Sequence, residues 1–449
     1  MKSMRWALAL MLGACATLTG VVSAKEFNGS PLVDALVKKG VLTSEEAEEV
    51  TYDLQKQYES TGGGMLSWGS SSVKGVKIYG DVRLRYQYTG TEGFNGNPSD
   101  RDAGAFRYRM RVGADYKFTD NFSAGVRFAT NVGENSTNIT MNSFLSGREA
   151  IQVDLYYLTY KNSDFYNTGW VNHFEVGVGK HKQAFMIDGA FWDSDINPEG
   201  AYVEAGWKGV GHQSIDVQAR GAAYILEGAF TDTEGAADQG HDFLFAVQTD
   251  VKYSWGKKNS ATIAPSFWVS SGGDNETGQP SLTFPTSGAP AGTRNGFKDF
   301  GVLYIPVEVK FEAWKLPHTV FGGYGINVLA DGSNNGIANN ARGIVGTQNQ
   351  MFQVGYKVGS ARKKGGWQLG GDYRYIEADA WSTALSDSDF GASDRNNVHG
   401  FTAKGTYAFT DFLTGSVTYL KSWNINTSAA LNGRTDSADV IQADLAWKF

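Results

Sequence analysis

The chain ends on the stretch Ala438-Asp439-Val440-Ile441-Gln442-Ala443-Asp444-Leu445-Ala446-Trp447-Lys448-Phe449. From Ile441 onward every second side chain is apolar, and the last two of these are the aromatic residues Trp447 and Phe449. A period of two places one face of a β-strand in an apolar medium and the other face in water. The stretch therefore predicts a β-strand rather than a helix, with an aromatic residue at its end.

The same alternation recurs throughout residues 75–449, in segments of roughly 10 to 14 residues joined by connections of alternating length. It predicts strands near 76–88, 105–118, 122–131, 150–161, 172–182, 200–209, 213–226, 241–255, 260–271, 298–313, 318–330, 349–359, 367–378, 397–409, 413–424 and 438–449. An even number of antiparallel strands closes into a barrel with both chain ends on one side. We therefore predict an all-β fold, a transmembrane antiparallel β-barrel of about sixteen strands.

The connections between these strands fall into two kinds. Short turns are predicted at 119–121, 256–259, 315–317 and 410–412. Long polar loops near 132–149, 273–297, 331–348, 380–396 and 425–437 are predicted to face outward from the other end of the barrel. No domain large enough to fill the lumen precedes the barrel, so about sixteen strands predict an aqueous channel.

The composition agrees with a barrel and excludes other classes. The 449 residues include 56 Gly, 26 Phe, 21 Tyr and 12 Trp, and the mean hydropathy is −0.32. Such values suit a barrel, because only every second strand residue faces lipid. The formal net charge of −7 offers no basic surface for nucleic acid, so nucleic-acid binding is not expected.

The amino-terminal residues predict export. Lys2 and Arg5 precede an apolar run, and Val22-Ser23-Ala24 forms a small-residue cleavage site, so residues 1–24 are predicted to be a signal peptide that is removed. The alternative is a membrane anchor, but Gly and Thr residues interrupt the apolar run. The single cysteine, Cys15, leaves with the signal, which excludes disulfides and thiolate chemistry in the mature chain.

Residues 25–60 have a different pattern from the barrel. One helix is predicted over 31–39 and ends at Gly40, and Thr43 with Glu46 forms a capping box for a second helix that runs to about Tyr58. Residues 61–74, rich in Gly and Ser, are predicted to form a flexible linker to the barrel at 75–449. The helical hairpin is either a trimerising or partner-binding element, or a solvated cap.

A group of arginines on the first three strands is the strongest candidate for a functional site. Its members all lie on the face opposite the apolar side chains: Arg83, Arg85, Arg107, Arg109, Arg111 and Arg127. A charged group on the lipid face at mid-bilayer costs about 2–4 kcal/mol, so these guanidinium groups are expected to line the lumen as a basic wall. Charged rings of this kind select ions in pores. The alternative is that Asp81 and Asp115 neutralise them in a structural network.

A second group is acidic and lies between the predicted fifth and sixth strands, in Trp192-Asp193-Ser194-Asp195-Ile196-Asn197-Pro198-Glu199-Gly200. The oxygen spacing is like that of a calcium loop, but the glycine and distal glutamate of an EF-hand are missing. The six histidines show no H-E-x-x-H pattern, and no G-x-S-x-G, phosphate-loop or haem-attachment motif is present. We therefore predict no enzyme activity, no cofactor and no metal site.

The order of these features resembles the putative porin family of Gram-negative outer membranes. The resemblance is carried by Leu32-Val33, by Gly40 to Thr43 before Glu45-Glu46-Ala47, by the strand pattern, by the segment 192–200 and by the terminal Phe449. It implies an outer-membrane barrel, similar to trimeric general porins, that lets ions and small hydrophilic solutes diffuse through a water-filled channel. It also implies that the segment 192–200 folds into the lumen, with Asp193, Asp195 and Glu199 across the channel from the basic wall.

Two functions of other classes remain open from the sequence. One is a scaffold barrel that sheathes a periplasmic partner or electron-transfer protein docked on residues 25–60. The other is an outer-membrane hydrolase, which the missing nucleophile motif disfavours. The expected partners are outer-membrane lipid, small solutes and two further copies of the chain.

Overall fold

The fold is taken from a computed structural model. It describes residues 65–66, 75–93, 101–131, 136–141, 150–162, 171–227, 242–271, 300–330, 347–391, 396–425 and 435–449. The predicted signal peptide (1–24), the helical hairpin (25–60) and nearly all of the linker (61–74) lie outside these residues. The chain divides into two compact units, Met1–Leu66 and Ser67–Phe449. The two-residue strand β1 (Met65–Leu66) belongs to the first unit.

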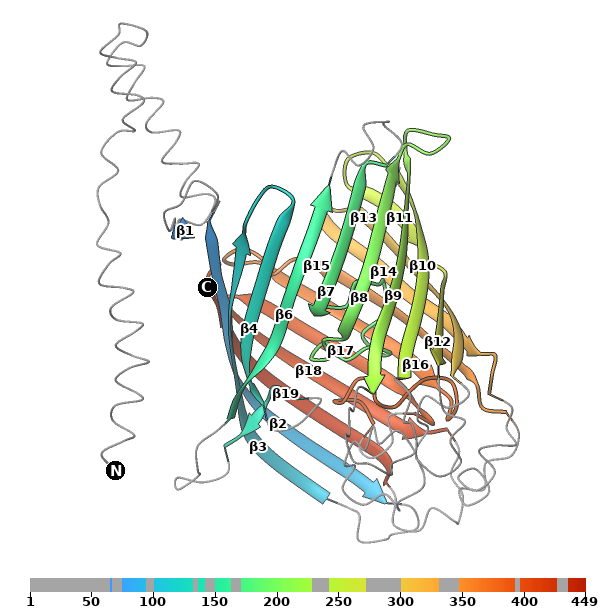
Figure 1. Ribbon diagram of the computed structural model, residues 1–449. Coiled ribbons are helices and arrows are strands. Elements are labelled where there is room, and N and C mark those ends of the chain that lie inside the picture. Colours follow the sequence, from blue (N-terminus) through green and yellow to red (C-terminus); the bar gives the residue numbers. More distant parts are fainter. Residues whose placement is uncertain are drawn as a thin grey trace, which may run out of the picture. The chain divides into compact units, whose positions relative to one another are not determined.

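The second unit is a closed antiparallel β-barrel of sixteen strands (Figure 1). Its first half consists of β2 (Val76–Gly93), β3 (Arg101–Lys117), β4 (Phe122–Asn131), β6 (Ala150–Asn162), β7 (His173–Lys180), β8 (Glu199–Lys208), β9 (Ile215–Glu227) and β10 (Asp242–Trp255). The second half consists of β11 (Asn259–Ile263) with β12 (Ser266–Ser271), β13 (Gly301–Ala313), β14 (Leu316–Asn327), β15 (Gln350–Gly359), β16 (Trp367–Ile376), β17 (Val398–Ala408), β18 (Leu413–Asn424) and β19 (Thr435–Lys448). A short strand, β5 (Ile139–Thr140), pairs with β3. None of the described residues forms a helix long and apolar enough to span a membrane.

The carboxy-terminal strand closes the barrel. β19 pairs with β2 in antiparallel register, so that Trp447 lies opposite Val82. The terminal Phe449 extends the ladder, because its N–H donates to the Gly80 carbonyl at 3.1 Å and its carbonyl accepts from the Gly80 N–H at 3.0 Å. Closure leaves no free strand edge. The strand predicted from the last residues of the sequence is therefore confirmed.

One predicted strand is broken in two. Residues 260–271 were expected to form a single strand, but they form β11 and β12, with Pro265 between them. Proline has no N–H to donate to a ladder. The Pro265 carbonyl still accepts from the Thr249 N–H at 3.1 Å, so β10 runs past both pieces and holds them in one wall position.

The barrel is apolar outside and polar inside. Leu84, Phe106 and Val112 are exposed on the outer face, whereas Arg85 and Arg127 on the inner face are 5% and 6% exposed. This is the reverse of a soluble protein and is the arrangement of a barrel whose outer face meets lipid. The alternation read from the sequence is thus confirmed for these strands.

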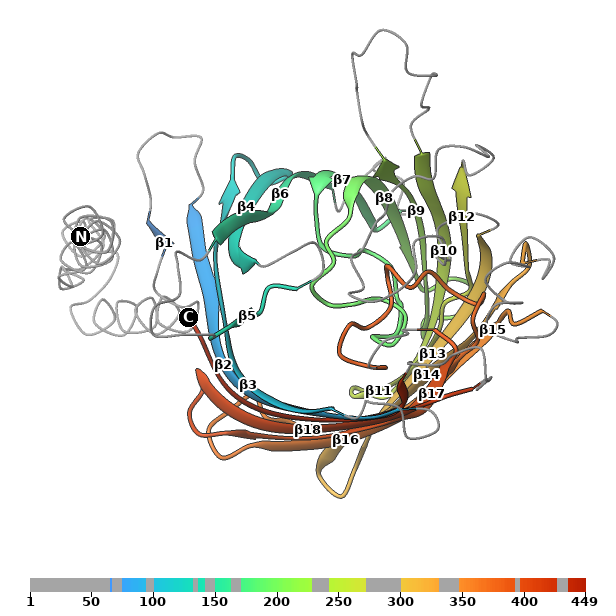
Figure 2. The same cartoon turned by 90° about the horizontal axis from the view of Figure 1, so that it is seen from below.

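Two connections fold back inside the barrel, where they are seen within the ring of strands in Figure 2. Inner loop 1 comprises residues 181–198, between β7 and β8, and inner loop 2 comprises residues 377–391, after β16. The sequence predicted that the loop near 380–396 faces outward, and for residues 380–391 this is wrong. Ala380 and Trp381 are 0% and 1% exposed, because they pack into an apolar cluster with inner loop 1.

Two glycines allow inner loop 1 to leave the wall. Gly179 on β7 and Gly200 on β8 are partners in the ladder, and their φ angles are +108° and +148°, in the region that side chains other than glycine rarely adopt. A Cβ atom on Gly179 would lie 2.2 Å from the Tyr156 carbonyl oxygen, and one on Gly200 would lie 2.2 Å from the Ala223 oxygen. Both positions therefore require glycine.

We expect Gly179→Ala to destabilise the barrel, by about 1–2 kcal/mol from the backbone conformation alone and more from the clash. The temperature at which the folded, heat-modifiable band unfolds on semi-native gels should fall. Gly189→Ala is the matched control, since a Cβ there meets nothing within 4 Å. Equal unfolding temperatures for the two variants would contradict this account of the loop's origin.

Candidate functional site

Hydrogen bonds join the two inner loops directly. The Asp193 N–H donates to the Leu385 carbonyl at 2.8 Å, and the Trp381 indole N–H donates to the Phe191 carbonyl at 2.5 Å. The Asp193 carboxylate also accepts the Ser388 N–H at 2.9 Å. Backbone groups that face one another in this way satisfy buried polar atoms that neither loop could satisfy alone.

An aromatic cluster fixes the joined loops to one side of the barrel wall. The ring of Phe191 lies 5.2 Å from that of Tyr304 on β13, and Trp192 lies 5.8 Å from Trp268 on β12. Trp381 from inner loop 2 lies 5.8 Å from Trp268. The Tyr304 hydroxyl also donates to Asp188 of inner loop 1. The two loops and the wall thus share one apolar core inside the lumen.

Burial changes the protonation of two loop carboxyl groups. The aromatic core excludes water from Asp193 and raises its pKa to about 6, although hydrogen bonds from Ser388 oppose the shift. Burial likewise raises the pKa of Asp188 to about 6, against the hydrogen bond from Tyr304. In the folded loops, both carboxyl groups therefore become negatively charged at a higher pH than an ordinary Asp side chain does.

We expect the joined loops to be more stable at pH 5 than at pH 7. A carboxyl whose pKa is raised from 3.8 to about 6 stabilises the folded form at low pH, and this contribution is lost as the pH rises through 6. Hydrogen exchange of amides in residues 188–196, corrected for intrinsic rates, should therefore be slower at pH 5. Asp193→Asn together with Asp188→Asn should remove the difference, and protection that rises with pH would have the wrong sign.

The predicted basic wall lies opposite this core, on β2, β3 and β4, and most of its arginines are ion-paired. Arg85 contacts Asp444 at 2.7 Å and Asp389 at 3.1 Å. Arg127 pairs with Asp154. Asp389 belongs to inner loop 2, so this loop contacts the wall as well as the aromatic core.

Arg109 and Arg111 share two carboxylates. Arg109 contacts Asp81 at 2.9 Å and Asp195 at 3.4 Å, and Arg111 contacts the same two groups at 2.7 and 3.9 Å. Asp195 also accepts a hydrogen bond from the Thr137 hydroxyl at 2.9 Å. Asp81 therefore partly neutralises Arg109 and Arg111, as the alternative reading of the sequence proposed.

Arg83 and Arg107 differ from the other four arginines. Arg83 donates to the Asn138 side-chain oxygen, and Arg107 donates to the Gln87 side-chain oxygen at 3.2 Å. Neither has a carboxylate at ion-pair distance among the residues that the structure describes. In this part of the chain a neutral amide accepts from each guanidinium group, which satisfies its hydrogen bonding without neutralising its charge.

The three acidic residues predicted for the constriction lie in different places. Asp195 is in contact with Arg109 and Arg111, as described above. Asp193 is held between the two inner loops, with its carboxylate also accepting the Asp195 N–H at 3.0 Å. Glu199 is the first residue of β8 and pairs with Lys180 at 3.0 Å.

Asp115 is the other carboxylate considered as a neutralising group for the arginines. It accepts a hydrogen bond from the Tyr157 hydroxyl at 2.7 Å.

A cavity of about 280 Å³ lies where the wall and the inner loops meet. Arg83 and Arg109 line it from the wall, Asp195 from inner loop 1, Asp389 from inner loop 2, and Lys357 from β15. Both signs of charge therefore face this space across a short distance. Such an arrangement can orient and select charged solutes.

Several residues of this site were not predicted from the sequence. Arg374 on β16 bonds Asp387 of inner loop 2 at 2.8 Å and Asp372 at 2.9 Å, and Asn138 reaches Arg83 from the loop after β4. The signal that could have revealed inner loop 2 is its aromatic content, Trp381 and Phe390, which matches Phe185, Phe191 and Trp192 in inner loop 1. The alternation along β16 also places Asp372 and Arg374 on one face.

Three solved structures are similar to the chain at low identity. They are Salmonella typhi OmpF in complex with daunomycin (10% identity, 84% of this chain and 98% of that chain, TM-score 0.47) and Pseudomonas putida OprB at high pH (11%, 84% and 94%, 0.49). The third is the outer membrane channel DcaP of Acinetobacter baumannii (12%, 85% and 99%, 0.43). Among curated proteins none matches the chain.

A family model gives the assignment. The model described as "Putative porin" matches residues 91–270 and 299–449, which include most of the barrel strands and both inner loops. The chain therefore belongs to the putative porin family of outer-membrane channels.

Proposed function

We propose that the protein is a channel for passive diffusion of ions and small hydrophilic solutes, narrowed by the basic wall and by the two inner loops. Three features support this proposal: the family, the sixteen-strand barrel with a polar inner face, and the cavity of about 280 Å³ lined by charges of both signs. A barrel of this size has room for water beside inward-folded loops. The solute gradient then drives transport, and the protein supplies the path.

We further propose that the channel prefers anions. The observation behind this is the pairing of the wall: Asp81, Asp195, Asp389 and Asp444 each lie against an arginine, whereas Arg83 and Arg107 have neutral partners among the described residues. Arg85 is shared by Asp389 and Asp444, so five guanidinium groups (Arg83, Arg85, Arg107, Arg109 and Arg111) face four carboxylates, and the wall keeps an excess of one positive charge. An anion entering the constriction would therefore meet a net positive wall.

The resemblance also implies a homotrimer, which we include in the proposal. The mass of the folded protein in detergent, measured by light scattering with the detergent contribution removed, should be three times that of the chain. A monomeric mass with full channel activity would remove trimerisation and leave the channel proposal intact.

Swelling of proteoliposomes tests the proposed diffusion. Liposomes that contain the folded protein should swell quickly in an isotonic pentose and more slowly in a tetrasaccharide, because the constriction limits solute size. Swelling in the pentose should also occur without any energy source. A folded barrel that gives no swelling in either sugar would overturn the proposal and favour the scaffold function considered from the sequence.

A further inference from the structure

The described strands bring two glutamates and a histidine together on the inner wall, away from the proposed constriction. Glu175 on β7 and Glu204 on β8 are direct partners in the ladder, and His173 lies two residues before Glu175. Like charges placed directly opposite on neighbouring strands repel each other. Lys161 pairs with Glu175 and Arg220 pairs with Glu204, so two cations beside the pair offset this repulsion, and a metal ion bound between the carboxylates would displace the first of them.

The three side chains converge on one point. The His173 Nε2 atom lies 2.8 Å from a Glu204 oxygen and 3.5 Å from a Glu175 oxygen. One ligand atom from each of the three residues lies within 4.8 Å of the others. Gly206 is the ladder partner of His173, and a Cβ there would lie 3.3 Å from the His173 Cβ, so the glycine leaves the imidazole room to lie across the strand.

Each carboxylate has its second oxygen fixed by another residue. The Tyr202 hydroxyl donates to the other oxygen of Glu175 at 2.6 Å, and Arg220 donates to the other oxygen of Glu204 at 2.5 Å. Metal-binding carboxylates in proteins are commonly oriented by hydrogen bonds of this kind. The oxygens that face His173 are thereby held in position rather than free to rotate.

We propose that His173, Glu175 and Glu204 form a binding site for a divalent transition-metal ion, of which Zn²⁺ is the best match. One imidazole nitrogen and two carboxylate oxygens suit Zn²⁺, with bonds of about 2.0–2.2 Å and water at the open position. Ligand atoms around such an ion are separated by about 3.4 Å, so the pair at 2.8 Å must open by about half an ångström. This is within the movement of side chains.

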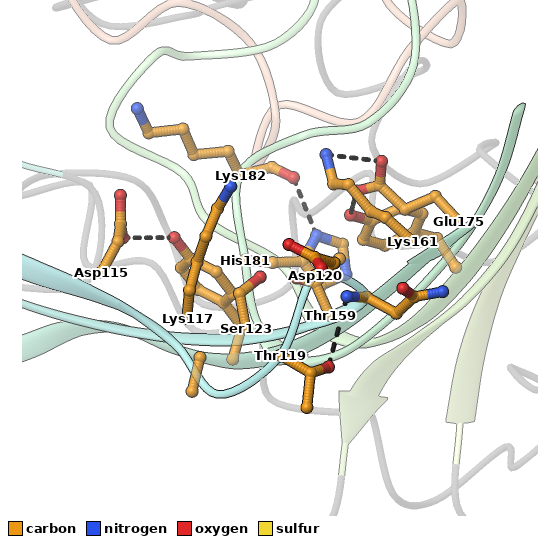
Figure 3. Close-up of a pocket in the computed structure, with 14 residues that line it drawn as sticks. Asp115, Lys117, Thr119, Asp120, Ser123, Thr159, Lys161, Glu175, His181 and Lys182 are labelled. Atoms are coloured by element: carbon orange, nitrogen blue, oxygen red, sulfur yellow. Dashed lines mark hydrogen bonds and ion pairs between the residues drawn. The ribbon is translucent and has the colours of Figure 1, made fainter. Parts of the chain in front are cut away.

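Two features of the surroundings decide how a metal ion reaches this group and what it must displace there. Glu175 lines a cavity of about 450 Å³ and His173 lines another of about 420 Å³, so an ion in the lumen can reach the group from either side. The ammonium group of Lys161 occupies the Glu175 oxygen that faces His173, at 2.7 Å, and Figure 3 shows this pair at the edge of the first cavity. The Lys161 side chain is 56% exposed, so its ion pair is weak and an ion can displace it.

Equilibrium dialysis of the folded, full-length protein against ZnCl₂, after removal of metals with EDTA, tests the proposal. We expect one zinc ion per chain in the wild type, and affinity lower by about tenfold or more in His173→Gln and in Glu204→Gln. His399→Gln is the matched control, because His399 contacts the Tyr373 hydroxyl and has no described carboxylate partner, so its binding should be unchanged. Absence of zinc binding by the wild type would overturn the proposal.

Lys161→Ala separates a metal site from a network of ion pairs. Because Lys161 competes for the Glu175 oxygen, its removal should tighten zinc binding by severalfold. X-ray absorption at the zinc edge should show a first shell of nitrogen and oxygen ligands and the outer-shell scattering of one imidazole ring. Weaker binding by Lys161→Ala, or a spectrum without imidazole scattering, would contradict the assignment even if the other variants failed to fold.

Discussion

Replacing Arg83 and Arg107 with glutamine should move the reversal potential of the channel toward that of a cation-preferring pore. These two guanidinium groups have amide partners, so their removal takes away positive charge without freeing a described carboxylate. A unit charge about 7 Å from a permeating ion contributes about 0.6 kcal/mol in bulk water and more where protein excludes water. The ratio of anion to cation permeability should therefore fall by about threefold or more for each charge removed.

The measurement is the zero-current potential across a planar bilayer in a KCl gradient. Arg362→Gln is the matched control, since Arg362 lies in the short connection between β15 and β16, outside the wall. Asp195→Asn should move the potential the opposite way, because it releases Arg109 and Arg111 from a shared partner. Identical potentials for wild type and all three variants would show that the constriction lies elsewhere in the lumen.

Trp381→Ala should enlarge the single-channel conductance and add current sublevels. Trp381 joins both inner loops to the wall, through ring contacts with Phe191, Trp268 and Phe300 and through its hydrogen bond to the Phe191 carbonyl. Truncation of such a buried side chain costs about 3–5 kcal/mol of packing. Because backbone ladders between neighbouring strands hold the wall, we expect the barrel to remain folded while the loops lose their fixed position.

Trp314→Ala controls for loss of a tryptophan. Trp314 lies in the turn between β13 and β14 and is 86% exposed, so its removal should change neither stability nor current. Semi-native gels establish that both variants are folded before the recording. A folded Trp381→Ala channel with the conductance and noise of the wild type would mean that the joined loops do not limit the current.

Much of the barrel could be predicted from the sequence, because the signals for its strands and turns lie within short segments of the chain. The period of two fixes which face of each strand is apolar, and Asp- or Gly-containing turns mark the ends, so β4 and β18 have the predicted bounds. The same parity predicts that the six arginines share the inner face, and Arg85 and Arg127 are buried. Pro265 was the local signal for the break between β11 and β12, and its effect was missed.

The partners of the arginines could not be predicted, because they depend on contacts between distant residues. Arg85 and Asp444 are 359 positions apart and meet only because β19 closes the barrel on β2 in one register. Inner loop 2 bonds inner loop 1 over a separation of 190 positions, through the aromatic core. Aromatic residues in a loop indicate that it is buried, but the packing of Trp381 and Phe191 against Trp268 and Tyr304 decides where in the lumen it lies.

The central claim is that the barrel holds an open aqueous path narrowed by charge. The most direct test is single-channel current of the purified, folded protein in a planar bilayer under a salt gradient. We expect stepwise conductance, with a reversal potential displaced toward the equilibrium potential of the anion. A correctly folded barrel that inserts but passes no current would contradict it, because the inner loops would then close the lumen completely.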